Sequence, residues 1–138
     1  MKARWTRWFA AIALVSAGLF LSSCQSEPTM RVALYSYQIS IDRTEFEAGQ
    51  ITLYVTNYSE KEPHEIALFR TDTPADFLPR TLVDTVNTAQ INPISSLVDV
   101  QPGVTRKQLL NLSPGHYIIL CNLPGHYDQG MYTEFDVK

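Results

Sequence analysis

The chain has 138 residues, of which 45% are hydrophobic, and its eleven basic and fourteen acidic side chains give a formal net charge of −3. This length suits one domain with its own hydrophobic core. Because the sequence contains no basic stripe, it argues against a nucleic-acid-binding protein. A mildly acidic surface favours a basic partner instead, through steering of the encounter more than through affinity.

The first 23 residues have the features of a secretion signal. Lys2, Arg4 and Arg7 supply positive charge, and the apolar run 9–21 is shorter than the about 20 residues needed to span a membrane. The run ends in Leu-Ser-Ser-Cys24, which resembles the lipobox of bacterial lipoproteins. In that family the signal is cut before the cysteine, whose sulfur and new amino group carry acyl chains. The alternatives are an ordinary signal peptide with an incidental cysteine, or an uncleaved anchor.

The lipoprotein resemblance implies a membrane-anchored protein outside the cytoplasm. Cleavage before Cys24 would leave eight basic and fourteen acidic residues, and therefore a net charge of −6. More than one acyl chain gives stable anchoring, whereas a single chain binds membranes marginally. We therefore expect a signal peptide at 1–23, a lipidated tether at 24–30 and one domain at 31–138. The domain would lie in the bacterial cell envelope, on the periplasmic face of either membrane or at the cell surface.

Alternation of apolar and polar residues dominates the domain and predicts a mostly β fold. In the clearest case, Ile51, Leu53 and Val55 alternate with threonine and tyrosine, as in a half-buried strand. The first half of the domain is expected to contain a strand over 32–41, a turn through 46–49, a strand over 51–56, a polar turn over 57–63 and a strand over 65–70.

The middle of the domain, residues 71–99, shows the weakest periodicity. The segment Thr-Pro-Ala-Asp76 is typical of the start of a short helix reaching about Val86, although Pro79 interrupts that helix. Asn92-Pro93 is a turn signal. We interpret this stretch as an excursion with a helical turn or two, inserted between strands.

Strand patterns return after the turn at Gln-Pro-Gly103, over 104–112, 116–121 and 131–137. About seven to eight short strands with a short helical insertion predict an all-β Greek-key sandwich and argue against a closed barrel. In the strand 116–121, Tyr117 and Cys121 share one face and His116 points to the other. His116 is therefore expected to be a surface or sheet-face histidine.

The loop between the last two predicted strands carries most of the chemistry. It places a thiol, an imidazole and a thioether at the spacing C-x4-H-x4-M, as Cys121, His126 and Met131. Two sulfur donors select copper over magnesium, calcium or manganese, which prefer oxygen. If Cys24 is lipidated, Cys121 is the one remaining thiol and cannot form a disulfide within the chain. Metal ligation then explains an unpaired cysteine in an oxidising compartment.

A second imidazole would complete a trigonal His2Cys site with a weak axial methionine. His64 is the candidate, because it opens a predicted strand and the chain has only three histidines. As an isolated residue, His64 is as readily a surface histidine that caps a turn. Met131 has its own alternative as core filler. A ligating imidazole binds in its neutral form, and its free nitrogen is usually oriented by a further hydrogen-bond partner.

These residues resemble the ligand pattern of the cupredoxins, the blue copper family, and the loop is most like those of rusticyanin and sulfocyanin. The lead-in Pro-Gly-His-Tyr117 before Cys121 is also similar. The resemblance implies one mononuclear type 1 copper ion, with His64, Cys121 and His126 as equatorial ligands and Met131 as the axial one. It further implies an electron carrier that cycles between Cu(II) and Cu(I) and is not an enzyme.

The resemblance also implies where partners dock. The exposed ligand histidine of the family corresponds to His126 in this sequence. Leu123, Pro124 and Tyr127 would then form an apolar patch around it, against which redox partner proteins dock.

One position departs from the family pattern. Many cupredoxins have asparagine or serine directly after the first ligand histidine, where it ties that loop to the residue after the cysteine. Here Glu65 occupies the position. Asn57 and Asn122 are the candidates to supply the missing bond.

Other functions remain open on the same residues. A protein for copper tolerance, storage or delivery would share the ligands but should offer further methionine or histidine, and the mature chain keeps only Met30 and His116. Copper enzymes of this fold need His-x-His motifs or a second cysteine in the loop, and neither occurs. A Cys121-dependent hydrolase leaves the methionine spacing unexplained. A metal-free adhesive or structural sandwich leaves the complete donor set unexplained.

Overall fold

The computed structural model describes residues 28–138, and the structural statements below concern these residues. They form nine strands in two sheets and one 3₁₀ turn. The expected signal peptide at 1–23, the lipidation site Cys24 and most of the tether lie outside the described residues. No helix in the described range is both long and apolar enough to cross a bilayer.

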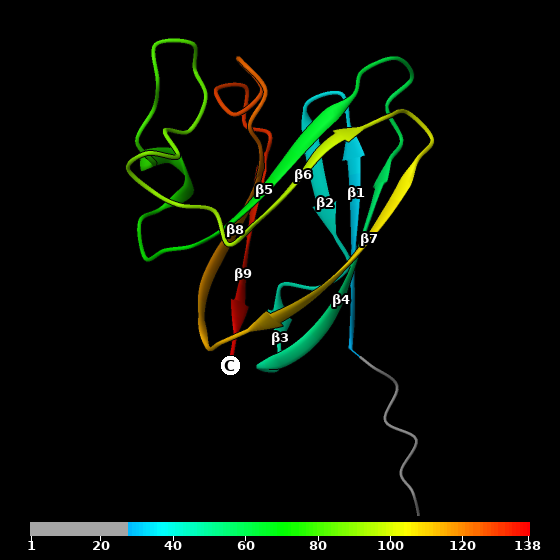
Figure 1. Ribbon diagram of the computed structural model, residues 1–138, viewed down its shortest axis with the longest axis vertical. Coiled ribbons are helices and arrows are strands. Elements are labelled where there is room, and N and C mark those ends of the chain that lie inside the picture. The colour runs from blue at the N-terminus through cyan, green and yellow to red at the C-terminus, as the bar shows by residue number, and fades with distance from the viewer. Residues whose placement is uncertain (1–27) are drawn as a thin grey trace, which may run out of the picture.

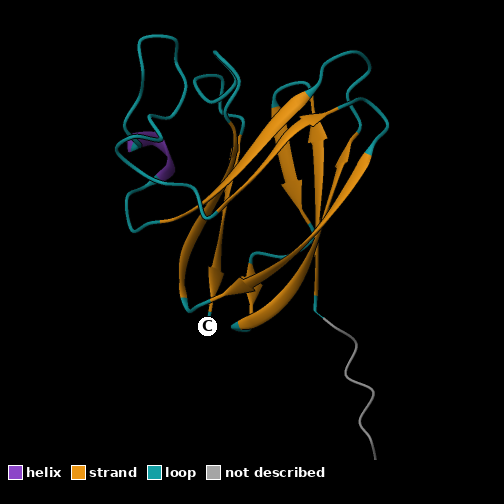
Figure 2. Ribbon diagram, in the orientation of Figure 1, coloured by secondary structure: helices purple, strands orange, loops and turns teal. Residues whose placement is uncertain are grey.

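Two sheets pack face to face as a sandwich (Figures 1 and 2). The four-stranded sheet has the order β2 (Gln38–Ile41), β1 (Thr29–Tyr35), β4 (Gly49–Asn57) and β7 (Thr105–Leu112). The five-stranded sheet has the order β3 (Glu45–Phe46), β9 (Tyr132–Val137), β8 (Gly115–Cys121), β5 (His64–Arg70) and β6 (Ser95–Val100). The β1–β4 and β3–β9 pairs are parallel and the other pairs are antiparallel. The all-β class is therefore confirmed, with nine strands where seven to eight were expected.

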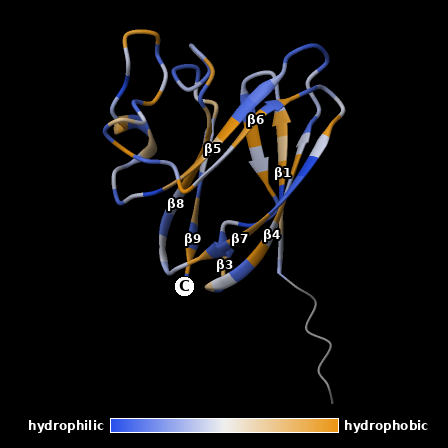
Figure 3. Cartoon of the chain, in the orientation of Figure 1, coloured by the Kyte–Doolittle hydropathy of each residue, from blue (hydrophilic) through white to orange (hydrophobic). Residues whose placement is uncertain are grey.

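Strand β8 is buried on both of its faces, in agreement with the predicted alternation. Tyr117, Ile119 and Cys121 face the core between the two sheets. Ile118 and Leu120 face a second apolar cluster, which the segment between β5 and β6 covers. Hydrophobic and polar residues alternate along β1, β2, β4 and β9, so these strands carry both kinds of residue (Figure 3). Cys121 therefore reaches the end of β8 as part of the main core.

The single strand expected over 32–41 is instead a hairpin. Its strands β1 and β2 pair with Val32 opposite Ile41 and Tyr35 opposite Gln38, so Ser36 and Tyr37 form the turn. A two-residue hairpin turn is usually announced by asparagine, aspartate or glycine. Neither residue of this turn is of that kind, and the run of β-forming residues on both sides conceals it.

The helix expected from Thr73 toward Val86 is reduced to one 3₁₀ turn, η1 (Ala75–Phe77). Pro79 lacks the N–H that a helix would need, and the chain leaves the turn directly. The excursion is also shorter than the predicted range 71–99, because residues 95–99 belong to the edge strand β6. The sequence of β6, Ser-Ser-Leu-Val-Asp-Val, does not alternate regularly between apolar and polar residues, and its Val98 is 63% exposed.

Candidate metal centre

Three of the four expected ligands meet at one end of the sandwich. His64 opens β5, Cys121 ends β8, and His126 lies in the loop 122–131 that joins β8 to β9, here called the ligand loop. Strands β5 and β8 are antiparallel with Ile66 opposite Cys121, which brings the start of one strand beside the end of the other. One ligand atom from each of the three residues lies within 4.8 Å of the other two.

The spacing of these atoms fits one metal ion. Cys121 Sγ lies 3.7 Å from His64 Nδ1 and 3.4 Å from His126 Nδ1. Metal bonds of about 2.0 to 2.3 Å to imidazole and thiolate, arranged trigonally, place the donors about 3.5 Å apart. The side chains therefore need no large movement to share an ion. A soft thiolate with two imidazoles suits copper or zinc and does not suit magnesium or calcium.

Met131 is placed by the backbone of the ligand loop. Its N–H donates to the carbonyl of His126 at 3.0 Å, and its own carbonyl accepts from the N–H of Cys121 at 3.0 Å. Gly125 and Gly130 have φ values of 78° and 86°, which glycine adopts without strain. The Met131 side chain is fully buried in the same core cluster as Cys121. The C-x4-H-x4-M spacing thus corresponds to a closed loop that brings its two ends together.

Burial sets the protonation of the three donors in the metal-free protein. Desolvation lowers the pKa of His64, and the neighbouring His126 lowers it further, whereas Glu62 raises it. Desolvation also lowers the pKa of His126 and raises the pKa of the Cys121 thiol. Both imidazoles are therefore held in the neutral form that ligates a metal. The thiol stays protonated until a metal displaces its proton.

The lowered pKa of both imidazoles predicts that the metal-free protein loses stability in mild acid. In the unfolded chain these histidines titrate near the ordinary value of about 6.5, and in the folded protein they titrate below it. The unfolded state therefore binds more protons as the pH falls through that value. The free energy of unfolding, from urea denaturation, should be lower at about pH 5.5 than at about pH 7.5. His126→Asn should make this dependence shallower, and equal stability at both pH values would contradict the prediction.

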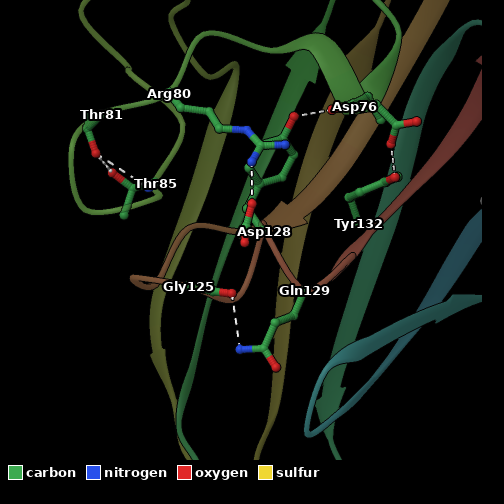
Figure 4. Close-up of polar contacts among 10 residues, drawn as sticks. Asp76, Arg80, Thr81, Thr85, Gly125, Asp128, Gln129 and Tyr132 are labelled. Carbon is green, nitrogen blue, oxygen red and sulfur yellow. Dashed lines mark hydrogen bonds and ion pairs between the residues drawn. The ribbon is translucent and has the colours of Figure 1, made fainter.

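The ligand loop is fastened to the segment 71–94, here called the insertion, which lies beside it at the same end of the sandwich (Figure 1). The side-chain carbonyl of Asn122 accepts from the N–H of Val86 at 2.7 Å. Arg80 forms an ion pair with Asp128 (Figure 4). Its guanidinium also lies 4.9 Å from the ring centre of Tyr127. The insertion therefore braces the ligand loop from outside.

Tyr127 does not belong to a docking surface. Its side chain is 1% exposed, and its hydroxyl donates to the carbonyl of Ala75 in the insertion. The expectation that Tyr127 contacts partners is therefore wrong, because the insertion covers it. Of the other two expected patch residues, Pro124 is exposed and Leu123 is half-buried against the core.

The link between the residue after His64 and the residue after Cys121 is present, although Glu65 stands where many cupredoxins have asparagine or serine, and it is made by the backbone. The N–H of Asn122 donates to the carbonyl of Glu65 at 3.0 Å, which joins the residue after Cys121 to the residue after His64. A backbone bond of this kind does not depend on the side chain at position 65. Neither Asn57 nor Asn122 uses its side chain for this link.

Asn57 instead organises the turn that precedes His64. This fully buried side chain donates to the carbonyls of Glu62 and Val100, both at 2.8 Å. Its carbonyl accepts from the N–H of Ser59 at 2.9 Å and from the Ser59 hydroxyl at 2.6 Å. One amide thus ties the turn 58–63 to the end of β6.

Two further residues near the centre were not identified from the sequence. The ring of Tyr37, in the β1–β2 turn, lies 5.2 Å from the ring of half-buried His126, and Tyr37 is 43% exposed. Glu62 acts electrostatically on both His64 and His126. Both residues lie in turns, Tyr37 between β1 and β2 and Glu62 before β5. No sequence motif therefore marks either of them as a neighbour of the ligands. His116 lies apart from the centre, with Nδ1 2.9 Å from a carboxylate oxygen of Asp136.

Comparison with known proteins places this geometry on a known fold. The sequence matches no family model and no curated protein. Auracyanin from Roseiflexus castenholzii is 21% identical with a TM-score of 0.58, over 82% of this chain and 98% of that one. Rusticyanin from Thiobacillus ferrooxidans is 13% identical with a TM-score of 0.60, over 82% and 79% of the two chains. Auracyanin B is 18% identical with a TM-score of 0.58, over 80% and 88%.

At these identities the likeness establishes the fold. The described part of the chain has the cupredoxin fold, the β-sandwich of auracyanin and rusticyanin. The fold that the resemblance to the cupredoxins implied is therefore confirmed.

Proposed function

We propose that the protein is a type 1 copper protein that carries single electrons between redox partners. The observation that supports this most strongly is the approach of the Cys121 sulfur to Nδ1 of both His64 and His126. A thiolate, two imidazoles and a weak thioether are the donors of blue copper sites. His64, Cys121 and His126 would be the equatorial ligands and Met131 the axial one. The fold is shared with rusticyanin, which is described as a copper protein.

The protein would hold the copper ligands rigidly and leave one of them, His126, within reach of redox partners. Bound copper would supply a one-electron couple between Cu(II) and Cu(I). The ligands come from two strand ends and a loop closed by its own backbone bonds, so the donor positions change little between the two states. Small rearrangement favours fast transfer. His126, half-buried beside exposed Pro124, is the ligand nearest the surface and marks the place where partners would dock.

We further propose that the mature protein is anchored in the bacterial cell envelope through lipid on Cys24. The support is the lipobox-like sequence before that residue. Strand β1 begins at the end of the sandwich opposite the ligand loop (Figure 1). An anchor attached before β1 would leave the copper end facing away from the membrane, where soluble partners can reach it.

Repeated oxidation and reduction distinguish an electron carrier from a protein for copper tolerance, storage or delivery. We expect the copper-loaded protein to retain its metal through several cycles in the presence of a Cu(I) chelator, because His64, Cys121 and Met131 are buried. Metal content and the visible absorption would be followed after each cycle. Transfer of the copper to the chelator at the first reduction would contradict electron carriage and favour delivery.

A further inference from the structure

Two buried side-chain atoms in the described part of the chain have no hydrogen-bond partner, and they belong to residues two positions apart in the sequence. They are Oε2 of Glu62 and Nε2 of His64. An unpaired buried polar atom costs about 1 to 3 kcal/mol, and more if it is charged. The two atoms are not bonded to each other in the structure. One is a carboxylate oxygen that can accept a hydrogen bond, and the other is an imidazole nitrogen that can donate one.

The backbone at Glu62 is held in place by the turn before β5. Its carbonyl accepts from the Asn57 side chain at 2.8 Å and from the Ser59 hydroxyl at 2.6 Å. Asn57 is itself fully buried and bonded to the end of β6. This clamp fixes the backbone of Glu62 two residues before His64, and the negative charge of the Glu62 side chain acts on both ligand histidines.

A metal bound to Nδ1 of His64 makes Nε2 of the same ring a hydrogen-bond donor. The Nδ1 atom faces the Cys121 sulfur at 3.7 Å, so the proton of the neutral ring must sit on Nε2 when a metal binds. That N–H is buried and needs an acceptor. Ligating histidines commonly donate this proton to a carboxylate, which fixes the ring orientation and increases its basicity.

We propose, resting on the proposed function, that Glu62 is a positioning residue for the copper site. When copper is bound, its carboxylate accepts the Nε2–H of His64, which satisfies both unpaired atoms. A carboxylate at this point stabilises Cu(II) more than Cu(I), because its charge interacts more strongly with the higher oxidation state. It therefore holds the reduction potential down. It also restricts rotation of the imidazole in both states.

Substitution of Glu62 tests this role through the potential and through the proton itself. Loss of such a partner weakens metal binding about 10-fold to 100-fold. If this loss falls on Cu(II), Glu62→Ala raises the potential by about 60 to 120 mV, at 59 mV per tenfold for one electron. In the diamagnetic Cu(I) protein, the Nε2–H resonance of His64 should be protected from exchange in the wild type and lost in Glu62→Ala. Glu62→Gln keeps an acceptor without the charge, so it should preserve the resonance and show a smaller shift in potential.

Glu60→Gln is the matched control, because this exposed residue in the same turn carries the same charge. It should leave the resonance unchanged and move the potential little. A potential and an Nε2–H resonance in Glu62→Ala equal to those of a normally coloured wild type would overturn the positioning role and leave the copper site intact. A wild type that binds no copper would instead overturn the proposed function on which the role rests.

Discussion

Replacement of Cys121 by serine is expected to abolish the intense thiolate-to-copper absorption of the Cu(II) protein. The sulfur is the donor that lies between both imidazoles, at 3.7 and 3.4 Å from their Nδ1 atoms. A hydroxyl is a harder and less basic ligand and does not support this transition. The metal-free protein should lose about 1 to 3 kcal/mol of stability, because a buried hydroxyl replaces a thiol that packs as a small hydrophobe.

Absorption spectroscopy of the copper-loaded variant, with copper content from equilibrium dialysis, checks this prediction. Ile119→Val is the matched control, because Ile119 lies on the same face of β8 and carries no donor atom. The control should keep the absorption of the wild type. A Cys121→Ser protein that keeps it as well would show that the thiolate is not a ligand.

Replacement of Asn57 by alanine is expected to cause the largest loss of stability outside the apolar core. The change removes four hydrogen bonds, three to Ser59 and Glu62 in the turn 58–63 and one to the carbonyl of Val100 in β6. It leaves the carbonyl of Val100 and the N–H of Ser59 without their partner in a buried place, each at a cost of about 1 to 3 kcal/mol. The free energy of unfolding of the metal-free protein should therefore fall by about 3 kcal/mol.

Chemical denaturation measures this loss, and Asn111→Ala supplies the control. Asn111 is exposed on β7, so its removal should change the free energy of unfolding by less than about 0.5 kcal/mol. If Asn57→Ala were as stable as this control, the turn before His64 would not depend on the amide.

Local patterns were sufficient to predict the fold class and the place of Cys121 and His126 at the centre, whereas His64 was chosen because the chain has only three histidines and by the resemblance to the cupredoxins. Alternation in β8 placed Cys121 on the core face and His116 on the other, as the structure shows. The glycines of the ligand loop predicted a tight return, and both have positive φ. These features depend on residues close together in the sequence, where side-chain periodicity and glycine conformation act directly.

The features that could not be predicted depend on contacts between distant segments. Tyr127 is buried because the insertion, about 50 residues earlier, folds over it. Tyr37 reaches His126 through a hairpin turn that has no turn residues to announce it. Glu62 stands in a polar turn of ordinary composition, and only its clamp by Asn57 and Ser59 gives it a fixed place.

The most direct test of the proposed copper site is the visible absorption and electron paramagnetic resonance of the wild-type protein loaded with Cu(II). A buried Cys121 thiolate bound with His64 and His126 predicts one copper per chain, an intense visible charge-transfer band, a narrow hyperfine splitting, and loss of both signals on reduction. A colourless protein, or one whose copper shows the wide splitting of nitrogen and oxygen ligands alone, would contradict a type 1 site built on these residues.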